Sequence, residues 1–407
     1  MQRTHSDARQ WLILIGLTLG VTVTNGFARF AYGLILPSMK QDLGWSYTQA
    51  GWINTANALG YVIGAIATLV LIHRISPARL FSVGMIGTAL FLAATAFTQD
   101  FIHLTNWRIL TGAFGALAFI AGGALSAGLF QDHHKRNALA IAVYFGVGGG
   151  LGLVLSGAVL PSLFDVRGAS AWPLAWGLLG ATSLLICPYC VWASESLRSP
   201  SKILNHAAQL PVKAMMPQIL SYFCFGLGYI VYITFLVALM REQAAGPVLV
   251  SIIWVILGFG IMVSSFVWTP LFAKHSSGLP MALIMLTMSV GTCLAVLMPN
   301  TIGLILSSAL FGLSVFMAPG AVTNFSRRNL PQSSWGAAVS LFTILFAVGQ
   351  TIGPVAAGML ADALGNIGLS LLVAGATLFC GAIIASFQKP LVCDSKRATS
   401  LPSRTST

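Results

Sequence analysis

The chain has 407 residues, of which 57% are hydrophobic and only 7% charged, and its mean hydropathy is +0.86. Soluble globular domains carry about 25% charged residues, so this composition excludes a soluble globule and predicts a polytopic membrane protein. The formal charge of +12 would point to nucleic acid in a soluble chain. In a membrane protein such basic residues set the topology, and we expect no nucleic-acid partner.

Twelve apolar runs are long enough to cross about 30 Å of hydrocarbon, a distance that takes about 20 helical residues. The sequence therefore predicts an all-α membrane protein with twelve transmembrane helices. In chain order the predicted spans cover residues 11–36, 47–72, 79–98, 104–130, 137–163, 172–193, 214–240, 247–273, 279–298, 301–325, 335–360 and 365–387.

Arg29 lies well inside the first predicted span. An arginine at a helix centre costs about 2.5–3.5 kcal/mol, so an intramembrane cation usually faces a bundle interior or a water-filled pathway. Asn25, Arg29 and Tyr32 share one helical stripe with Thr18 and Thr22, while apolar residues fill the other faces. This pattern predicts the polar lining of a cavity. The alternative is that Arg29, about seven residues from the predicted outer end, snorkels to the membrane surface.

Polar residues at helical spacing in other spans extend this lining. The candidate substrate-binding residues are Asn25, Arg29, Tyr32, Asn57, Tyr61, Arg108, Tyr229, Tyr232 and Gln350. The tyrosines of the seventh span could flank a flat or aromatic substrate. Each amide and tyrosine could instead form a structural contact with a neighbouring helix, and Arg108 could snorkel, because it lies about one turn from the predicted outer end of its span.

The predicted spans lack the groups that most membrane enzymes and pumps require. No lysine follows a glycine, so the P-loop of ATP-driven transport is absent from the sequence. No span interior contains a histidine or a carboxylate, and we expect no catalytic residues, no metal, no cofactor and no enzymatic activity. Two intramembrane arginines without an embedded counter-ion suggest that the negative charge arrives with the substrate. A small organic anion fits this pattern best.

An internal repeat of about 200 residues divides the chain. Val147-Gly-x3-Gly-x4-Gly157 matches Val348-Gly-x3-Gly-x4-Gly358, and adding 200 to Arg29 gives Tyr229. Parallel repeats that meet at a central site are a transporter arrangement. The predicted parts are an N-terminal six-helix half (1–193), a cytoplasmic linker (194–213), a C-terminal six-helix half (214–387) and a cytoplasmic tail (388–407).

The segment Leu36-Pro-x-Met-x3-Leu-Gly-Trp-Ser-x2-Gln-Ala-Gly51, together with the glycine-rich fifth and eleventh spans, resembles the major facilitator superfamily. More narrowly, the segments 26–32 and 222–235 are similar to the YbfB/YjiJ-type group of bacterial transporters. The resemblance implies two pseudo-symmetric six-helix halves, a cavity lined by the helix that carries Arg29, and a gating or coupling role for Arg108.

We therefore predict a secondary active or facilitative transporter of a small organic anion that works by alternating access. It is expected to be a monomer in the lipid bilayer of the bacterial cytoplasmic (inner) membrane. One alternative is an efflux carrier for mixed amphiphilic compounds. A second, of a different class, is a non-transporting membrane sensor, although the longest predicted inner segments, of about twenty residues, leave little room for a signalling domain.

The distribution of lysine and arginine over alternate loops predicts the orientation. Sixteen of the 21 basic residues fall on one side, three (Lys40, Arg167 and Arg241) fall on the other, and Arg29 and Arg108 lie within spans. Both termini are therefore expected in the cytoplasm.

Topology reporters test this orientation directly. Fusions at Asn205 and in the C-terminal tail should report the cytoplasm, whereas fusions at Asp165 and Glu242 should report the outside. The reverse result at any two of these positions would overturn the predicted helix count.

Overall fold

The computed structural model describes residues 7–72, 74–197, 210–331 and 334–391. Within these residues, twelve helical stretches are long and apolar enough to cross a membrane, which confirms the predicted all-α class and number of spans. They cover Asp7–Leu43, Tyr47–Leu71, Pro77–Phe97, Phe101–Ala127, Lys135–Arg167, Ala169–Glu195, Val212–Glu242, Pro247–Lys274, Leu279–Leu297, Thr301–Asn329, Trp335–Leu364 and Ile367–Ser386.

Several spans are built from more than one helical element. In chain order these are α1 (Asp7–Val21), η1 (Thr22–Phe30), α2 (Tyr32–Leu43), α3 (Tyr47–Leu71), α4 (Pro77–Ala94), η2 (Thr95–Phe97), α5 (Phe101–Ala127), α6 (His134–Ala142), η3 (Val143–Val147), α7 (Gly148–Arg167), η4 (Ala169–Ala171), α8 (Trp172–Glu195), η5 (Val212–Met215), α9 (Met216–Glu242), α10 (Pro247–Lys274), α11 (Leu279–Leu297), α12 (Thr301–Val315), α13 (Met317–Asn329), α14 (Trp335–Leu364) and α15 (Ile367–Ser386).

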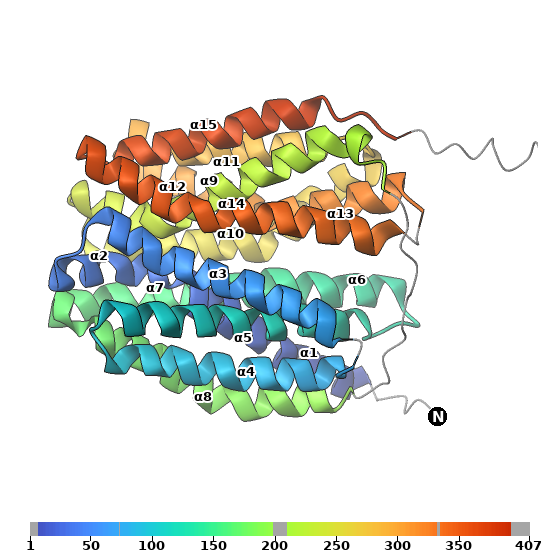
Figure 1. Cartoon of the computed structure of the whole chain (residues 1–407), viewed down its shortest axis with the longest axis horizontal. Coiled ribbons are helices and arrows are strands. Elements are labelled where there is room, and N and C mark those ends of the chain that lie inside the picture. Colours follow the sequence, from blue (N-terminus) through green and yellow to red (C-terminus); the bar gives the residue numbers. More distant parts are fainter. Residues whose placement is uncertain (1–6, 73, 198–209, 332–333, 392–407) are drawn as a thin grey trace, which may run out of the picture.

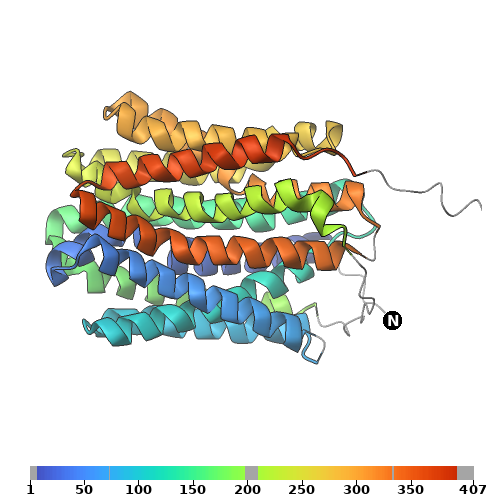
Figure 2. The ribbon, with the colours of Figure 1, turned by 45° about the horizontal axis from the view of Figure 1, so that its top comes forward.

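The helices form one elongated bundle of two halves (Figures 1 and 2). Elements α1 to α8 make the first half and η5 to α15 the second. The halves meet where α3 packs on α14, α7 on α10, and α2 on α9. We call the end at which α1 begins and α15 stops, on the right of Figure 1, the terminal end, and the opposite end the distal end. The predicted linker 194–213 and tail 388–407 lie largely outside the described residues, so those boundaries stay predictions.

The first span is longer than predicted at its distal end. It continues through Pro37 to Leu43 and stops at Gly44, whose φ of 65° is the left-handed helix cap that glycine favours. Arg29 therefore lies about 20 Å from the end of its helix, at 1.5 Å per residue, roughly twice the distance expected from the sequence. Likewise α5 begins at Phe101, which places Arg108 about two turns inside. Both arginines are buried rather than snorkelling.

The middle of the first span is a π-helix rather than an α-helix. In η1 the backbone N–H of Ala31 donates to the carbonyl of Gly26 at 2.8 Å, which is the i to i−5 pattern, and all nine residues of η1 are buried. Gly26 lies against Gly152 of α7 so closely that a Cβ on Gly26 would be 2.4 Å from the Cα of Gly152. Glycine at position 152 of the fifth span therefore allows the two helices to pack closely. π-Helical turns are frequent at functional sites.

Hydrogen bonds between the halves close the distal end. The Asp362 carboxylate of α14 accepts from the backbone N–H groups of Tyr47 and Thr48, both at 2.8 Å, and from the Thr48 hydroxyl at 2.5 Å. The Tyr47 hydroxyl donates to Glu242 of α9. A carboxylate at the first turn of α3 is also favoured by the helix dipole.

The closure continues toward the middle of the bundle. Asn54 of α3 donates to the Thr234 hydroxyl at 2.5 Å, and Thr55 donates to the carbonyl of Thr351 at 2.8 Å. Among the described residues, every hydrogen bond between the halves lies in the distal part or at mid-height. Within this part of the chain, hydrogen bonds thus join the two halves on the distal side and at mid-height.

Gly358 offers a test of this closure, because a Cβ there would lie 2.3 Å from the carbonyl oxygen of Tyr47. In a background without the six native cysteines, Thr55→Cys should react slowly with a membrane-impermeant maleimide added from the distal side. Adding Gly358→Leu should raise this rate several-fold, because the distal ends of α3 and α14 can no longer approach.

Gly336→Leu on the same helix is the matched control, because a Cβ at Gly336 meets nothing within 4 Å. Equal labelling rates in the two leucine variants, at equal expression, would contradict the closure.

Candidate functional site

Arg29 lies at the contact between the two halves, at mid-height in the bundle. Its side chain comes from η1 and is only 6% exposed. Nη2 of Arg29 donates to the hydroxyl of Tyr229 on α9 at 2.8 Å and to Oε1 of Gln350 on α14. The Tyr229 hydroxyl donates in turn to the same Gln350 oxygen at 2.9 Å. The structure therefore brings together three of the predicted site residues, one from the first half and two from the second.

The charge of Arg29 has only neutral partners. Among the described residues the salt bridges are His103 with Asp100 and Arg136 with Asp7, and neither involves Arg29. The hydrogen bonds of Arg29 in this part of the chain use Nη2, which leaves the N–H groups of Nε and Nη1 to donate to another acceptor. A charge-assisted hydrogen bond from such a group to a carboxylate is about twice as strong as a neutral one. A buried cation without an anion is what an anion site requires before its ligand binds.

Aromatic rings of the second half surround the Tyr229 side of this cluster. Phe346 of α14 stacks on Tyr229 at 5.5 Å and on Tyr222 at 5.3 Å between ring centroids, and Phe225 stacks on Tyr229 at 4.7 Å. Phe225 and Phe346 were not among the residues predicted from the sequence. The aromatic spacing of three and four along positions 222, 225 and 229 was the available signal, because it places those rings on one helix face.

Aromatic rings of the first half lie on the other side of Arg29. Its guanidinium carbon is 5.0 Å from the ring centroid of Tyr61 and 5.9 Å from that of Phe30, both within cation–π range. The ring centroid of Tyr61 is in turn 6.4 Å from that of Phe119 on α5. Tyr61, Phe119 and Phe346 are partly exposed and lie in the terminal halves of their helices. A flat ligand that reaches Arg29 from the terminal end would thus meet aromatic faces contributed by both halves.

Arg108 belongs to a separate cluster inside the first half. It is fully buried, its Nη1 donates to the Ala28 carbonyl at 2.7 Å, and its guanidinium carbon lies over the rings of Tyr32 and Trp176, at 5.4 and 5.0 Å. Its Nε and Nη2 have no hydrogen-bond partner among the described residues. Arg108 thus fastens α5 to the π-helical segment that carries Arg29, which makes it a positioning group rather than a direct neighbour of the second half.

Three further predicted residues, Tyr32, Asn57 and Asn25, also lie in the first half. Tyr32 donates to the carbonyl of Ala50 at 2.7 Å, and Asn57 donates to the carbonyl of Arg108 at 3.1 Å, so both have partners in the first half. Asn25 is buried in η1 one turn from Arg29.

Tyr232 packs within the second half instead of facing Arg29. Its hydroxyl pairs with that of Ser307 at 2.7 Å, and its ring stacks on Phe311 at 3.9 Å. Of the two tyrosines predicted to flank a substrate, only Tyr229 contacts Arg29.

The acids nearest the spans have structural partners. Asp42 accepts from the Trp172 indole at 2.8 Å. Asp100 caps α5 and accepts a hydrogen bond from the backbone N–H of His103. This bond, together with the contact to the His103 ring, lowers the pKa of the Asp100 carboxyl below its usual value. These acids, like Asp362, lie at helix ends and far from the level of Arg29.

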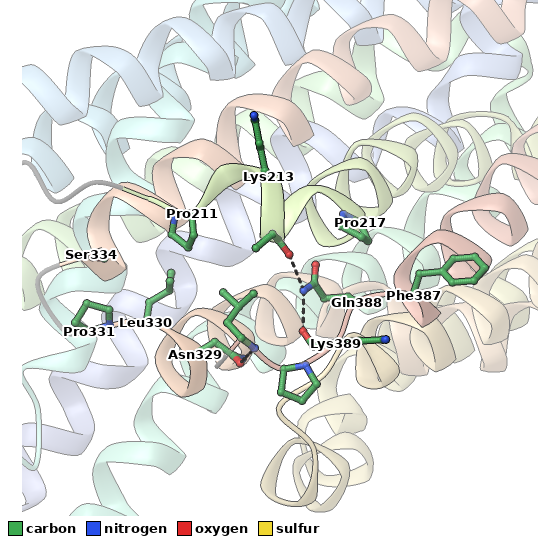
Figure 3. Close-up of a pocket in the computed structure, with 13 residues that line it drawn as sticks. Pro211, Lys213, Pro217, Asn329, Leu330, Pro331, Ser334, Phe387, Gln388 and Lys389 are labelled. Atoms are coloured by element: carbon green, nitrogen blue, oxygen red, sulfur yellow. Dashed lines mark hydrogen bonds between the residues drawn. The ribbon is translucent and has the colours of Figure 1, made fainter. Parts of the chain in front are cut away.

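A cavity of about 580 Å³ lies at the terminal end of the second half (Figure 3). Its lining includes Lys213, Asn329, Gln388 and Lys389, and Gln388 donates to the carbonyls of Ala214 and Lys389 in its floor. None of the predicted site residues lines it, so it is distinct from the Arg29 cluster.

Comparison with known families identifies this architecture. Residues 21–386 match the family described as uncharacterised MFS-type transporter YbfB. The chain belongs to this family of major facilitator transporters. The match spans both halves, including Arg29, Tyr229 and Gln350. The expected superfamily and subgroup are confirmed, and the chain is a multi-pass membrane protein of a transporter family rather than of an enzyme family.

Several bacterial transporters are similar to this chain, over part of its length or over nearly all of it. The gallate transporter of Pseudomonas putida is 30% identical over 186 residues, which cover 46% of this chain and 40% of that protein. The 3-(3-hydroxy-phenyl)propionate transporter of Escherichia coli is 30% identical over 199 residues, which cover 48% of this chain and 47% of that protein. The chain thus spans less than half the length of these two relatives. The inner membrane transport protein YdhP of Escherichia coli is 26% identical over 93% of this chain and 97% of its own.

Solved structures share the fold. A bacterial homologue of the human lysosomal transporter Spinster, in an inward-facing and occupied conformation, has a TM-score of 0.70 at 18% identity, over 94% of this chain and 97% of its own. The nucleoside transporter NupG has a TM-score of 0.70 at 12% identity, and the match covers 92% of this chain and 99% of NupG. This likeness supports the two-half arrangement of the twelve spans.

An Arg108 variant can test whether this residue only holds its neighbouring helices in place or binds the ligand itself. Arg108→Lys keeps the charge but loses the planar group that reaches Ala28 and lies over two rings. We expect the free energy of unfolding to fall by about 1–3 kcal/mol, measured as a lower melting temperature. The further rise in melting temperature caused by the predicted ligand, a small organic anion, should persist. A variant with an unchanged melting temperature and no ligand-induced rise would instead place Arg108 in the binding site.

Proposed function

We propose that this chain carries a small aromatic carboxylate across the membrane by alternating access, with Arg29 as the residue that binds the carboxylate. The observation that carries the proposal is the buried guanidinium of Arg29, which lies where the two halves meet and whose hydrogen-bond partners among the described residues are the neutral Tyr229 and Gln350. A charge inside the membrane is usually paired. An incoming carboxylate supplies the missing partner.

The aromatic part of the proposal is supported by the rings on both sides of Arg29. The partly exposed ring of Tyr61 in the first half lies 5.0 Å from the guanidinium carbon of Arg29, and the partly exposed ring of Phe346 in the second half stacks on Tyr229, which bonds Arg29. Ring-to-ring contacts of this kind add about 0.5–1.5 kcal/mol each beyond buried area. Two partly matching relatives are named as transporters of gallate and of a hydroxyphenylpropionate, which are both aromatic carboxylates.

Alternating access is supported by where the halves are fastened. The hydrogen bonds between the described parts of the two halves extend from the distal end to Arg29 and no further. We infer that the substrate reaches Arg29 from the terminal end in this state. Rocking one half against the other would then break the Asp362 bonds and expose Arg29 at the distal side.

We further propose that the terminal end faces the cytoplasm of a bacterial cell and that the carrier works as a monomer in the inner membrane. The strong excess of lysine and arginine on the side of the chain termini supports this orientation. Both halves of the binding cluster come from one chain, so a second copy is not needed to complete it.

A thermal-shift screen of the purified protein tests the substrate class. Ligands at 100 times their dissociation constant add about 2.7 kcal/mol to the native state. We expect 4-hydroxybenzoate and related aromatic carboxylates to raise the melting temperature, and aromatic amides, aliphatic carboxylates and amphiphilic cations to have little effect. Selective stabilisation by the cations would favour the efflux carrier for mixed amphiphiles instead.

The Arg29→Gln variant tests the residue itself. It should remain folded, because it removes a costly intramembrane charge, and it should lose aromatic carboxylate binding and counterflow in proteoliposomes. Arg241→Gln, which removes an exposed arginine at the distal end, is the matched control and should bind as the parent does. Equal affinity in the Arg29 variant and the parent would refute the proposal.

A further inference from the structure

The amide of Gln350 holds a buried donor for which the described protein supplies no acceptor. Gln350 lies at mid-height on α14, is fully buried, and its Nε2 has no hydrogen-bond partner among the described residues. An unsatisfied buried polar group costs about 1–3 kcal/mol. Such a group calls for a functional explanation.

Chemistry fixes which atom of the amide is left over. Arginine carries only donors, so the amide must present its oxygen to Arg29, and the nitrogen then points elsewhere. The same oxygen also accepts from the Tyr229 hydroxyl at 2.9 Å. With both donors directed at Oε1, the Nε2 group remains as a second, uncharged donor beside the guanidinium.

We propose that Gln350 is the specificity-determining residue that recognises a ring hydroxyl of the aromatic carboxylate bound by Arg29. This inference rests on the proposed function and adds a second contact to it. The carboxylate accepts from the remaining N–H groups of the guanidinium, and the hydroxyl oxygen accepts from Nε2 of Gln350. The preferred substrates are then hydroxylated aromatic monocarboxylates, while the unsubstituted acids leave the amide donor unpaired.

The expected selectivity follows from the cost of that unpaired donor. A site built to hydrogen-bond a hydroxyl rejects the analogue that lacks it more strongly than an apolar pocket does. We expect the parent protein to bind 3-hydroxybenzoate or 4-hydroxybenzoate at least about tenfold more tightly than benzoate.

Calorimetric titration of the purified full chain with benzoate and the two hydroxybenzoates tests this role. Gln350→Met keeps a side chain of similar length without a donor. It should bring the ratio of the dissociation constants of benzoate and the hydroxybenzoates close to one. Gln218→Met is the matched control, because Gln218 is also a buried amide with an unpartnered side-chain atom among the described residues, but lies at the start of α9. It should keep the preference for the hydroxylated ligands.

A second variant guards against misfolding of the first. Gln350→Glu places an acceptor-only carboxylate next to Arg29 and should fold, because the new ion pair satisfies the buried guanidinium. It should weaken the binding of all three ligands at least a hundredfold. A preference for the hydroxybenzoates that survives in Gln350→Met, or unchanged binding in Gln350→Glu, would overturn the role of Gln350. If the parent binds benzoate and the hydroxybenzoates equally, only this inference fails; if it binds none of them, the proposed function fails with it.

Discussion

The structure depends on the need to keep one guanidinium hydrogen-bonded inside a low-dielectric bundle. Arg29 reaches from the first half to two neutral partners on the second, so the hydrogen bonds that satisfy the charge also join the halves. An arginine at this depth costs about 2.5–3.5 kcal/mol, and neutral donors and acceptors offset only part of that. In the proposed function this residual imbalance favours an anion over a neutral ligand, and it lies at the contact that alternating access would break and remake.

The internal repeat explains why this contact forms where it does. Arg29 and Tyr229 are 200 positions apart and occupy equivalent places in the two halves, and they meet across the contact between the halves. Glycines at the equivalent positions 26 and 226 allow the neighbouring span to approach in each half: Gly26 lies against Gly152, and Gly226 lies against the backbone of Phe346. The symmetry is broken by chemistry, because one half supplies a cation and the other a phenol and an amide.

The sequence was sufficient to predict the number of spans and the burial of Arg29 within the bundle, because helix length and a charge inside an apolar run are local properties. It also pointed to Tyr229 through the repeat. It could not place Arg108 and Tyr232, whose roles depend on partners far away in the chain: Trp176 beside Arg108, and Phe311 beside Tyr232. The length of the first span was underestimated because proline commonly ends a helix, whereas here the helix continues past Pro37. Neighbouring helices in a membrane bundle can satisfy the backbone groups that such a proline frees.

The proposed function requires an aromatic carboxylate to bind to the guanidinium of Arg29 between the two halves. A structure of the protein determined with bound 4-hydroxybenzoate is the decisive measurement. We predict that the carboxylate oxygens lie about 2.7–2.9 Å from Arg29 nitrogens, the distance of a charge-assisted hydrogen bond, with the ring between the aromatic side chains of the two halves. Ligand bound elsewhere, with Arg29 still bonded only to Tyr229 and Gln350, would contradict it.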